Sequence, residues 1–335
     1  MPVQIGLLVV ASITAGLAVA WLTGPVRKFL IRRGVYDAPN ARSLHAEKKP
    51  RGGGLAILAV VLPGWLAADW MLGLEMPVPA AVLVCIGLAA VSLVDDVRGL
   101  PASTRLGAQA LAVVAGTACL VDGPVFQGLL PPWLDALAAG FAWLWFVNLY
   151  NFMDGIDGIS GVETAAVGFG LGLVALVTGG LVAEAVLPWL LAGSAAGFLW
   201  WNWSPSKIFL GDVGSVTLGF ALGWLLLHSA AQGQWAAALI LPAYYLADAT
   251  ITLLRRLARL EKVWQAHRSH AYQRAVQAGR SHAAVSSRIA LANVLLVGCA
   301  VWAATGTPAP ALMGGFAVSL SLWAALSRTR VRAVS

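Results

Sequence analysis

Residues 134–158 read LDALAAGFAWLWFVNLYNFMDGIDG. The first part of this stretch is apolar and reaches the length of a membrane-spanning helix, which is about 17–25 residues. The second part carries amides and carboxylates, which are costly near hydrocarbon and therefore indicate a functional reason for their presence. This one stretch predicts both a helix that crosses a membrane and a polar site at its end.

The apolar pattern recurs along the whole chain. Of its 335 residues, 59% are hydrophobic and 11% are charged, whereas an ordinary soluble domain has about 25% charged residues. Apolar stretches predict eleven helices near 3–23, 54–73, 78–95, 106–121, 134–150, 161–182, 186–202, 213–231, 235–254, 288–305 and 310–326. The sequence therefore predicts an all-α integral membrane protein with about eleven transmembrane helices and a single domain over residues 1–335.

The basic residues are confined to one side of the predicted membrane. All 22 Lys and Arg fall in or beside the segments 24–53, 95–105, 203–212, 255–287 and 327–335. By the positive-inside rule, this bias predicts that the N-terminus is outside and the C-terminus is in the cytoplasm. The formal net charge of +7 is then a topology signal, and we expect no nucleic-acid partner.

Five carboxylates lie on the predicted cytoplasmic side, namely Asp95, Asp96, Asp154, Asp157 and Asp212. Asp95 and Asp96 end an apolar run. Neighbouring residues of a helix point about 100° apart, so these two carboxylates cannot both face lipid safely. One or both should therefore bind a cation or a proton. A pair of solvated acids at a helix end is the alternative interpretation.

The segment from Asn148 to Gly158 places a polar residue at every third position: Asn148, Asn151, Asp154 and Asp157. On a helix this spacing predicts one polar stripe. Amides and carboxylates in such a stripe suit a hard cation. Mg²⁺ is expected because it takes oxygen ligands and joins carboxylates to substrate phosphates, with Mn²⁺ as an alternative. A capping or turn role is the simpler interpretation of this segment.

The segment Gly211-Asp212-Val-Gly-Ser215 lies between an inside loop and a helix start. It is either an ordinary N-cap or an anion or metal site at a helix N-terminus. Basic groups next to such carboxylates could neutralise phosphate oxygens, although plain topology explains single Lys and Arg residues equally well. The candidate basic residues are His45, Lys48, Lys49, Arg51, Arg105, His267, Arg268 and His270. His282 has no such neighbours and is not included.

These motifs resemble those of the polyprenyl-phosphate N-acetylhexosamine-1-phosphate transferase superfamily (glycosyltransferase family 4), which includes the muramyl-pentapeptide translocase. The resemblance covers nearly the whole chain. It rests on Ser92-Leu-Val-Asp-Asp96, on the segment from Asn148 to Gly158, on Lys207 to Ser215 and on His267-x-x-His270. It implies Mg²⁺-dependent transfer of an N-acetylhexosamine-1-phosphate from a UDP-sugar to undecaprenyl phosphate, with release of UMP.

The resemblance also implies roles for single residues. The catalytic set would be Asp95, Asp96, Asp154 and Asp157. The metal set would be Asp212, Asp95 and Asp96. The substrate-binding set would be Asn148, Asn151, Lys48, Arg105, Gly211, His267, Arg268 and His270.

The setting that the resemblance implies is the bacterial cytoplasmic (inner) membrane and the start of a cell-surface polysaccharide of the O-antigen type, with a homodimer as an open possibility. N-acetylglucosamine is the expected sugar, and N-acetylfucosamine and N-acetylquinovosamine are alternatives. A membrane transporter, with acids at mid-depth on broken helices, and an aspartate-rich prenyltransferase are the competing functions.

Overall fold

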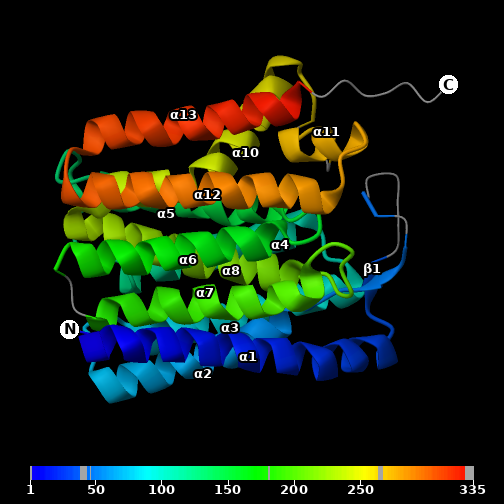
Figure 1. Cartoon of the computed structure of the whole chain (residues 1–335), viewed down its shortest axis with the longest axis horizontal. Helices are drawn as coiled ribbons and strands as arrows, with labels where there is room; N and C mark the ends of the chain where they lie inside the picture. The colour runs from blue at the N-terminus through cyan, green and yellow to red at the C-terminus, as the bar shows by residue number, and fades with distance from the viewer. Residues whose placement is uncertain (1, 38–43, 46, 180–181, 263–266, 329–335) are drawn as a thin grey trace.

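The computed structural model describes residues 2–37, 44–45, 47–179, 182–262 and 267–328, and these residues form a bundle of helices (Figure 1). The α-helices are α1 (Pro2–Arg32), α2 (Gly54–Leu72), α3 (Val78–Arg98), α4 (Ala102–Cys119), α5 (Pro132–Met153), α6 (Ile159–Val177), α7 (Val182–Asn202), α8 (Asp212–Ser229), α9 (Trp235–Ile240), α10 (Ala243–Ala258), α11 (Ala271–Gln277), α12 (His282–Thr305) and α13 (Pro308–Ser327). A π-helix, η1 (Ala230–Gln234), joins α8 to α9, and two short strands, β1 (Tyr36–Asp37) and β2 (Lys49–Pro50), pair after α1.

Within the described residues, eight helices are long and apolar enough to cross a membrane. The prediction of an all-α membrane protein is therefore confirmed. Each of the eleven apolar stretches of the sequence overlaps a helix, but eleven crossings and their orientation stay predictions. The start of α1 and the end of α13 lie at opposite ends of the bundle, and β1 and α11 lie at the same end as the end of α13 (Figure 1).

One predicted helix is interrupted. The stretch 235–254 was expected to be continuous, but α9 ends at Ile240 and α10 begins at Ala243. Pro242 lies at the break, and a proline has no backbone N–H for the helical hydrogen bond and clashes with the preceding turn. The prediction of one continuous helix over 235–254 is wrong. The first helix also continues to Arg32, beyond the predicted end near residue 23.

Helix α8 occupies the centre of the bundle (Figure 1), and every residue from Asp212 to Leu226 is buried. Tryptophan side chains from neighbouring helices and from α8 itself bond to main-chain carbonyl groups around it. Nε1 of Trp143 donates to the carbonyl oxygen of Phe220 at 3.0 Å. Buried indole N–H groups need such partners. The central helix therefore has a fixed position, and its N-terminus is held at the end of the bundle that carries the polar loops.

Helices α1 and α7 pack through glycine. They lie side by side in Figure 1, and a Cβ atom on Gly197 would lie 1.9 Å from the carbonyl oxygen of Gly16. Oγ of Ser12 donates to the carbonyl oxygen of Trp189 at 2.9 Å. In membranes, helix association depends on such close backbone approach because lipid is as apolar as the side chains.

We predict that Gly197→Ala lowers the free energy of unfolding by about 1–3 kcal/mol, because the added methyl group forces α1 and α7 apart. Thermal unfolding in detergent measures the change. Gly87→Ala is the matched control, since a Cβ atom at Gly87 would meet nothing within 4 Å. Equal melting temperatures for the two variants would contradict the proposed contact.

Candidate functional site

The site begins where the loop after α1 meets the loop before α8. Arg51, which follows β2, pairs with Phe209 in an isolated parallel bridge. The backbone N–H of Gly53 donates to the carbonyl oxygen of Phe209 at 2.8 Å. A Cβ atom on Gly54 would lie 2.2 Å from Cα of Gly214. Glycine is required at this position because the main chains at the starts of α2 and α8 touch.

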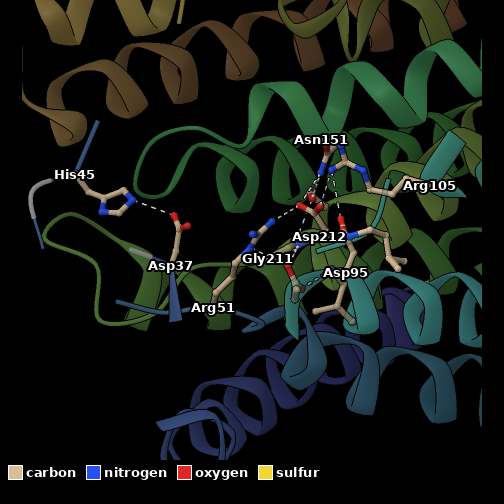
Figure 2. Close-up of polar contacts among 12 residues, drawn as sticks. Asp37, His45, Arg51, Asp95, Arg105, Asn151, Gly211 and Asp212 are labelled. Carbon is tan, nitrogen blue, oxygen red and sulfur yellow. Dashed lines mark hydrogen bonds and ion pairs between the residues drawn. The ribbon is translucent and has the colours of Figure 1, made fainter. Parts of the chain in front are cut away.

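Arg51 joins two of the predicted site carboxylates. Its Nε lies 2.7 Å from Oδ1 of Asp96, and its Nη2 donates to Oδ1 of Asp212 at 2.6 Å (Figure 2). Burial lowers the pKa of the Arg51 guanidinium, but the charges of Asp212 and Asp96 outweigh burial and raise it above its usual range. The guanidinium is therefore a permanent positive charge between two acids.

Asp96 caps the central helix from a different part of the chain. Its Oδ1 accepts from the backbone N–H of Asp212 at 2.9 Å, and its Oδ2 accepts from the N–H of Val213 at 3.0 Å. Such N–H groups at a helix start have no partner inside the helix and attract anions. Gly211 has a φ of 77°, and a Cβ atom there would lie 2.7 Å from Oδ2 of Asp96. These contacts favour a positioning role for Asp96; its predicted catalytic and metal roles stay predictions.

A second arginine, Arg105, bridges Asp95, the neighbour of Asp96, to Asp212. Nη1 of Arg105 lies 3.3 Å from Oδ2 of Asp95 and 3.5 Å from Oδ2 of Asp212. Nδ2 of Asn151 donates to Oδ1 of Asp212 at 3.1 Å and to Oγ of Ser215 at 2.8 Å. The structure therefore brings together the predicted residues Asp95, Asp96, Arg105, Asn151, Gly211 and Asp212 with Arg51, one of the candidate basic residues. All of these residues except Asp96 are labelled in Figure 2.

Asp95 and Asp212 are the residues that fit a metal ion. Their carboxylates converge on one guanidinium nitrogen. In the described part of the chain, no group of three or more His, Cys, Asp or Glu residues is arranged to hold a metal. Mg²⁺ commonly takes one or two protein carboxylates and completes its shell with water and substrate phosphates. The pair therefore fits an ion that arrives with a phosphate-bearing substrate.

The predicted polar stripe is only half helical. Asn148 and Asn151 lie in α5, but the helix ends at Met153, and Asp154 has φ −83° and ψ 58°. Gly158 has a φ of 81°, a left-handed conformation that glycine adopts readily. The chain turns between these points, so Asp157 does not continue the stripe. The prediction of one helical stripe is wrong for Asp154 and Asp157.

Asp157 anchors the loop before α8 to the loop after α5. Its carboxylate accepts from the backbone N–H of Ser206 at 3.1 Å and from Oγ of Ser206 at 2.7 Å. Nδ1 of His282 lies 3.4 Å from Oδ2 of Asp157. Burial raises the pKa of this carboxyl, but the hydrogen bonds from His282 and Ser206 prevail and hold it below its usual range. Asp157 is thus an ionised structural residue, and its predicted catalytic role stays a prediction.

Asp154 lies beside an open space that Asp157 also lines. It lines a polar cavity of about 380 Å³ together with Arg51, Arg105, Asn151 and Asp212. Burial raises the pKa of Asp154 to about 7, and the charge of Asp212 contributes in the same direction. A cation or a hydrogen-bond donor in the cavity would therefore change the protonation of Asp154 near neutral pH.

His282 also lines this cavity, although sequence reasoning left it out. It begins α12 and meets Asp157 across more than a hundred positions of the chain. No local spacing connects the two residues. Only knowledge that α12 packs against α6 would have brought His282 into the predicted site.

The predicted histidine motif lies apart from this cavity. His270 is buried, with Nδ1 3.7 Å from Oδ1 of Asp248, and its ring stacks on Tyr272 at 5.6 Å. Asp248 accepts from the backbone N–H of Ala271 at 2.8 Å, so it caps α11. Burial and the neighbouring His270 lower the pKa of His267 to about 4, which leaves that ring neutral.

Two other predicted contacts are exposed. The Arg268 side chain lies on the surface. The ammonium group of Lys48, also exposed, lies 4.4 Å from the ring centre of Tyr36. Neither of them, nor His267 or His270, is among the described residues that line the polar cavity. Their predicted contacts with substrate stay predictions.

A second space adjoins the polar cavity. It is a cleft of about 200 Å³ between α3, α4, α5 and α8, with walls that include Leu88, Val91, Leu106, Ala108 and Val216. Its polar lining includes Asn148 and Gln109. Arg105, Asn151 and Asp212 line both spaces. The carboxylate and arginine cluster therefore stands where a polar cavity meets a mostly apolar cleft.

Together, the fold and this cluster define a multi-pass membrane protein with an acidic, arginine-bridged site at one end of its helix bundle. The model of glycosyl transferase family 4 matches residues 78–230. A decaprenyl-phosphate N-acetylglucosaminephosphotransferase of Mycolicibacterium smegmatis is 32% identical over 340 residues, which cover 90% of this chain and 82% of that protein. The chain belongs to glycosyl transferase family 4, within the polyprenyl-phosphate N-acetylhexosamine-1-phosphate transferase superfamily.

Two further relatives agree with this assignment. A protein named as a probable undecaprenyl-phosphate N-acetylglucosaminyl 1-phosphate transferase of Bacillus subtilis is 28% identical, over 87% of this chain and 82% of its own length. The decaprenyl-phosphate N-acetylglucosaminephosphotransferase of Mycobacterium tuberculosis is 28% identical, over 90% of this chain and 82% of its own length. The protein is a transferase, and the transporter and the aspartate-rich prenyltransferase are set aside.

We predict that Asp157→Asn lowers the free energy of unfolding by about 1–3 kcal/mol, because an amide cannot accept all the bonds of the buried carboxylate. Since the pKa of Asp157 is held low, its contribution is present at neutral pH and is lost only as the pH falls below the ordinary carboxyl range. Thermal unfolding at pH 7 measures the loss of stability, and its decline is followed from pH 4 down to pH 2. Asp122→Asn, at an exposed acid, is the control, and equal unfolding of both variants at pH 7 would contradict the role.

Proposed function

We propose that this protein transfers N-acetylglucosamine-1-phosphate from UDP-N-acetylglucosamine to undecaprenyl phosphate and releases UMP. The observation that carries the proposal is the junction of two unlike spaces at Arg105, Asn151 and Asp212. A water-soluble sugar nucleotide suits the polar cavity, and an amphiphilic lipid phosphate suits the apolar cleft. The names of the relatives support the sugar and the class of lipid.

In the proposed reaction, an oxygen of the lipid phosphate forms a bond to the β-phosphorus of the sugar nucleotide. The bond from that phosphorus to the bridging oxygen breaks, and UMP leaves with the electron pair. A phosphate monoester has its second pKa near about 6, so the nucleophile is already ionised at neutral pH. The carboxylates are therefore not required as general bases, and positioning and charge neutralisation remain the main tasks.

The proposed roles follow from the contacts. Arg105 neutralises phosphate at the junction, and Arg51 holds Asp212 in place while Asn151 fixes the rotamer of the same carboxylate. Asp212 and Asp95 would hold Mg²⁺, which when bound would neutralise phosphate charge. The phosphates of the donor would complete the ligand shell.

The acceptor cleft contains an unusual amide. Gln109 is buried in α4, one turn beyond Arg105, and its Oε1 has no hydrogen-bond partner among the described residues. An unpaired buried polar atom is costly, so a group that enters the cleft, or water, would satisfy it. The ionised lipid phosphate cannot donate to Oε1 of Gln109, so water would satisfy that atom. The apolar walls suit a prenyl chain, and Arg105 suits its phosphate end. We place the lipid phosphate there.

Purified protein, undecaprenyl phosphate, Mg²⁺ and a panel of UDP-N-acetylhexosamines test the reaction by UMP release and by radiolabelled sugar in the organic phase. We expect activity with UDP-N-acetylglucosamine that is lost with EDTA, and a fall in kcat of about a hundredfold or more for Asp212→Asn, the size typical of a lost electrostatic contact. Asp122→Asn is the control and should keep full activity. Folded protein without UMP release for any donor would overturn the proposal.

The acceptor cleft is tested by filling it. We predict that Ala108→Phe raises KM for undecaprenyl phosphate about tenfold, or about 1.4 kcal/mol, and leaves KM for the sugar nucleotide unchanged. Leu111→Phe, on the exposed face of the same helix, is the matched control. If only the KM for the sugar nucleotide increased, the lipid would have to bind outside this cleft. The O-antigen pathway and a homodimer stay predictions.

A further inference from the structure

A second acid and base pair lies at the rim of the polar cavity. Oδ2 of Asp37, at the end of β1, lies 2.9 Å from Nε2 of His45, and both residues line the cavity. The pair stands apart from the Arg51 cluster, with Asp37 between His45 and Arg51 (Figure 2). The His45 ring also contacts Phe209, with 4.8 Å between ring centres.

The hydrogen bonds of His45 hold its ring from both sides. Its Nδ1 lies 2.9 Å from the backbone carbonyl oxygen of Glu47, and its Nε2 lies 2.9 Å from Oδ2 of Asp37. The ring therefore holds the Asp37 side chain in one orientation.

The other oxygen of Asp37 is free for a ligand. Among the described residues, Oδ1 of Asp37 has no hydrogen-bond partner, and the side chain is 33% exposed at the cavity rim. A carboxylate whose orientation is fixed through one oxygen presents its second oxygen as a ready acceptor. The matching ligand group is a hydrogen-bond donor.

We propose that Asp37 is a specificity residue that accepts a hydrogen bond from a hydroxyl group of the sugar nucleotide. The inference rests on the proposed function, because that function supplies the ligand of the cavity. Phosphate is excluded as the partner of Asp37, since two anions repel. A divalent cation is disfavoured because the positive charge of Arg51 already acts on Asp37. Both the ribose and the hexosamine carry suitable hydroxyl groups.

The size of the effect follows from the kind of bond. Hydrogen bonds to a charged acceptor are about twice as strong as neutral ones, and a site built to bond a hydroxyl group rejects the analogue that lacks it. Asp37→Leu removes the acceptor. Asp37→Asn keeps the size of the side chain and a bond to His45, but it offers the ligand only a neutral oxygen. The loss should therefore be graded, and larger for the Leu variant.

Steady-state kinetics and calorimetric binding of UDP and UDP-N-acetylglucosamine test the proposal. We expect KM and Kd for UDP-N-acetylglucosamine to rise about tenfold or more in Asp37→Leu and less in Asp37→Asn, with kcat and KM for the lipid nearly unchanged. Glu47→Gln removes an exposed acid from the same loop and is the matched control. An unchanged Kd in Asp37→Leu would overturn the inference.

Deoxy donors identify the hydroxyl group. The donor that lacks the contacted hydroxyl group should bind wild-type protein weakly, and Asp37→Leu should not lower its affinity any further. If Asp37→Leu lowers the affinity for UDP as much as for UDP-N-acetylglucosamine, the hydroxyl group is on the ribose. If it lowers only the affinity for UDP-N-acetylglucosamine, the hydroxyl group is on the hexosamine. Binding that depends on Asp37 without any turnover would overturn the proposed transfer and keep the Asp37 contact. Turnover with equal KM and Kd in all variants would overturn only the Asp37 contact.

Discussion

The ion pair network of Arg51 with Asp96 and Asp212 is the constraint on which the rest of the site depends. One guanidinium fixes the end of α3 against the start of α8, and Asp96 then satisfies the first N–H groups of that helix. Without Arg51, two carboxylates would face one another in a partly buried place, which is strongly unfavourable. The charges that are buried next to the membrane thus compensate one another within one compact cluster.

This cluster also separates two environments. The polar cavity and the apolar cleft share three lining residues and differ in all the others. In the proposed reaction, a water-soluble donor would reach Asp212 from the polar cavity and a lipid would reach it from the apolar cleft. The arrangement accounts for a site at the end of the bundle, where helix ends supply both polar groups and apolar walls.

Much of the fold follows from the sequence, because the length of the apolar stretches is a strong signal. The orientation that the bias of Lys and Arg indicates stays a prediction. The segment 235–254 shows where prediction from the sequence fails. Pro242 can be read from the sequence, but whether it kinks or breaks a helix depends on the packing around it. In the site, Asp95, Asp96 and Asp212 were found from local motifs. His282 was not, because its partner Asp157 lies on another loop and no spacing within the chain connects them. Asp37 was not, because no motif pointed to it, although its partner His45 is only eight residues away.

The contact of Gly54 with Gly214 has a consequence for how the site works. At this point two main chains touch, so the separation of the loop that carries Arg51 from the helix that carries Asp212 is set by backbone atoms and not by rotamers. Such a site is organised before any ligand arrives, and little reorganisation is needed when charge moves during a reaction. A substitution of either glycine would therefore affect the rate of the reaction as much as folding.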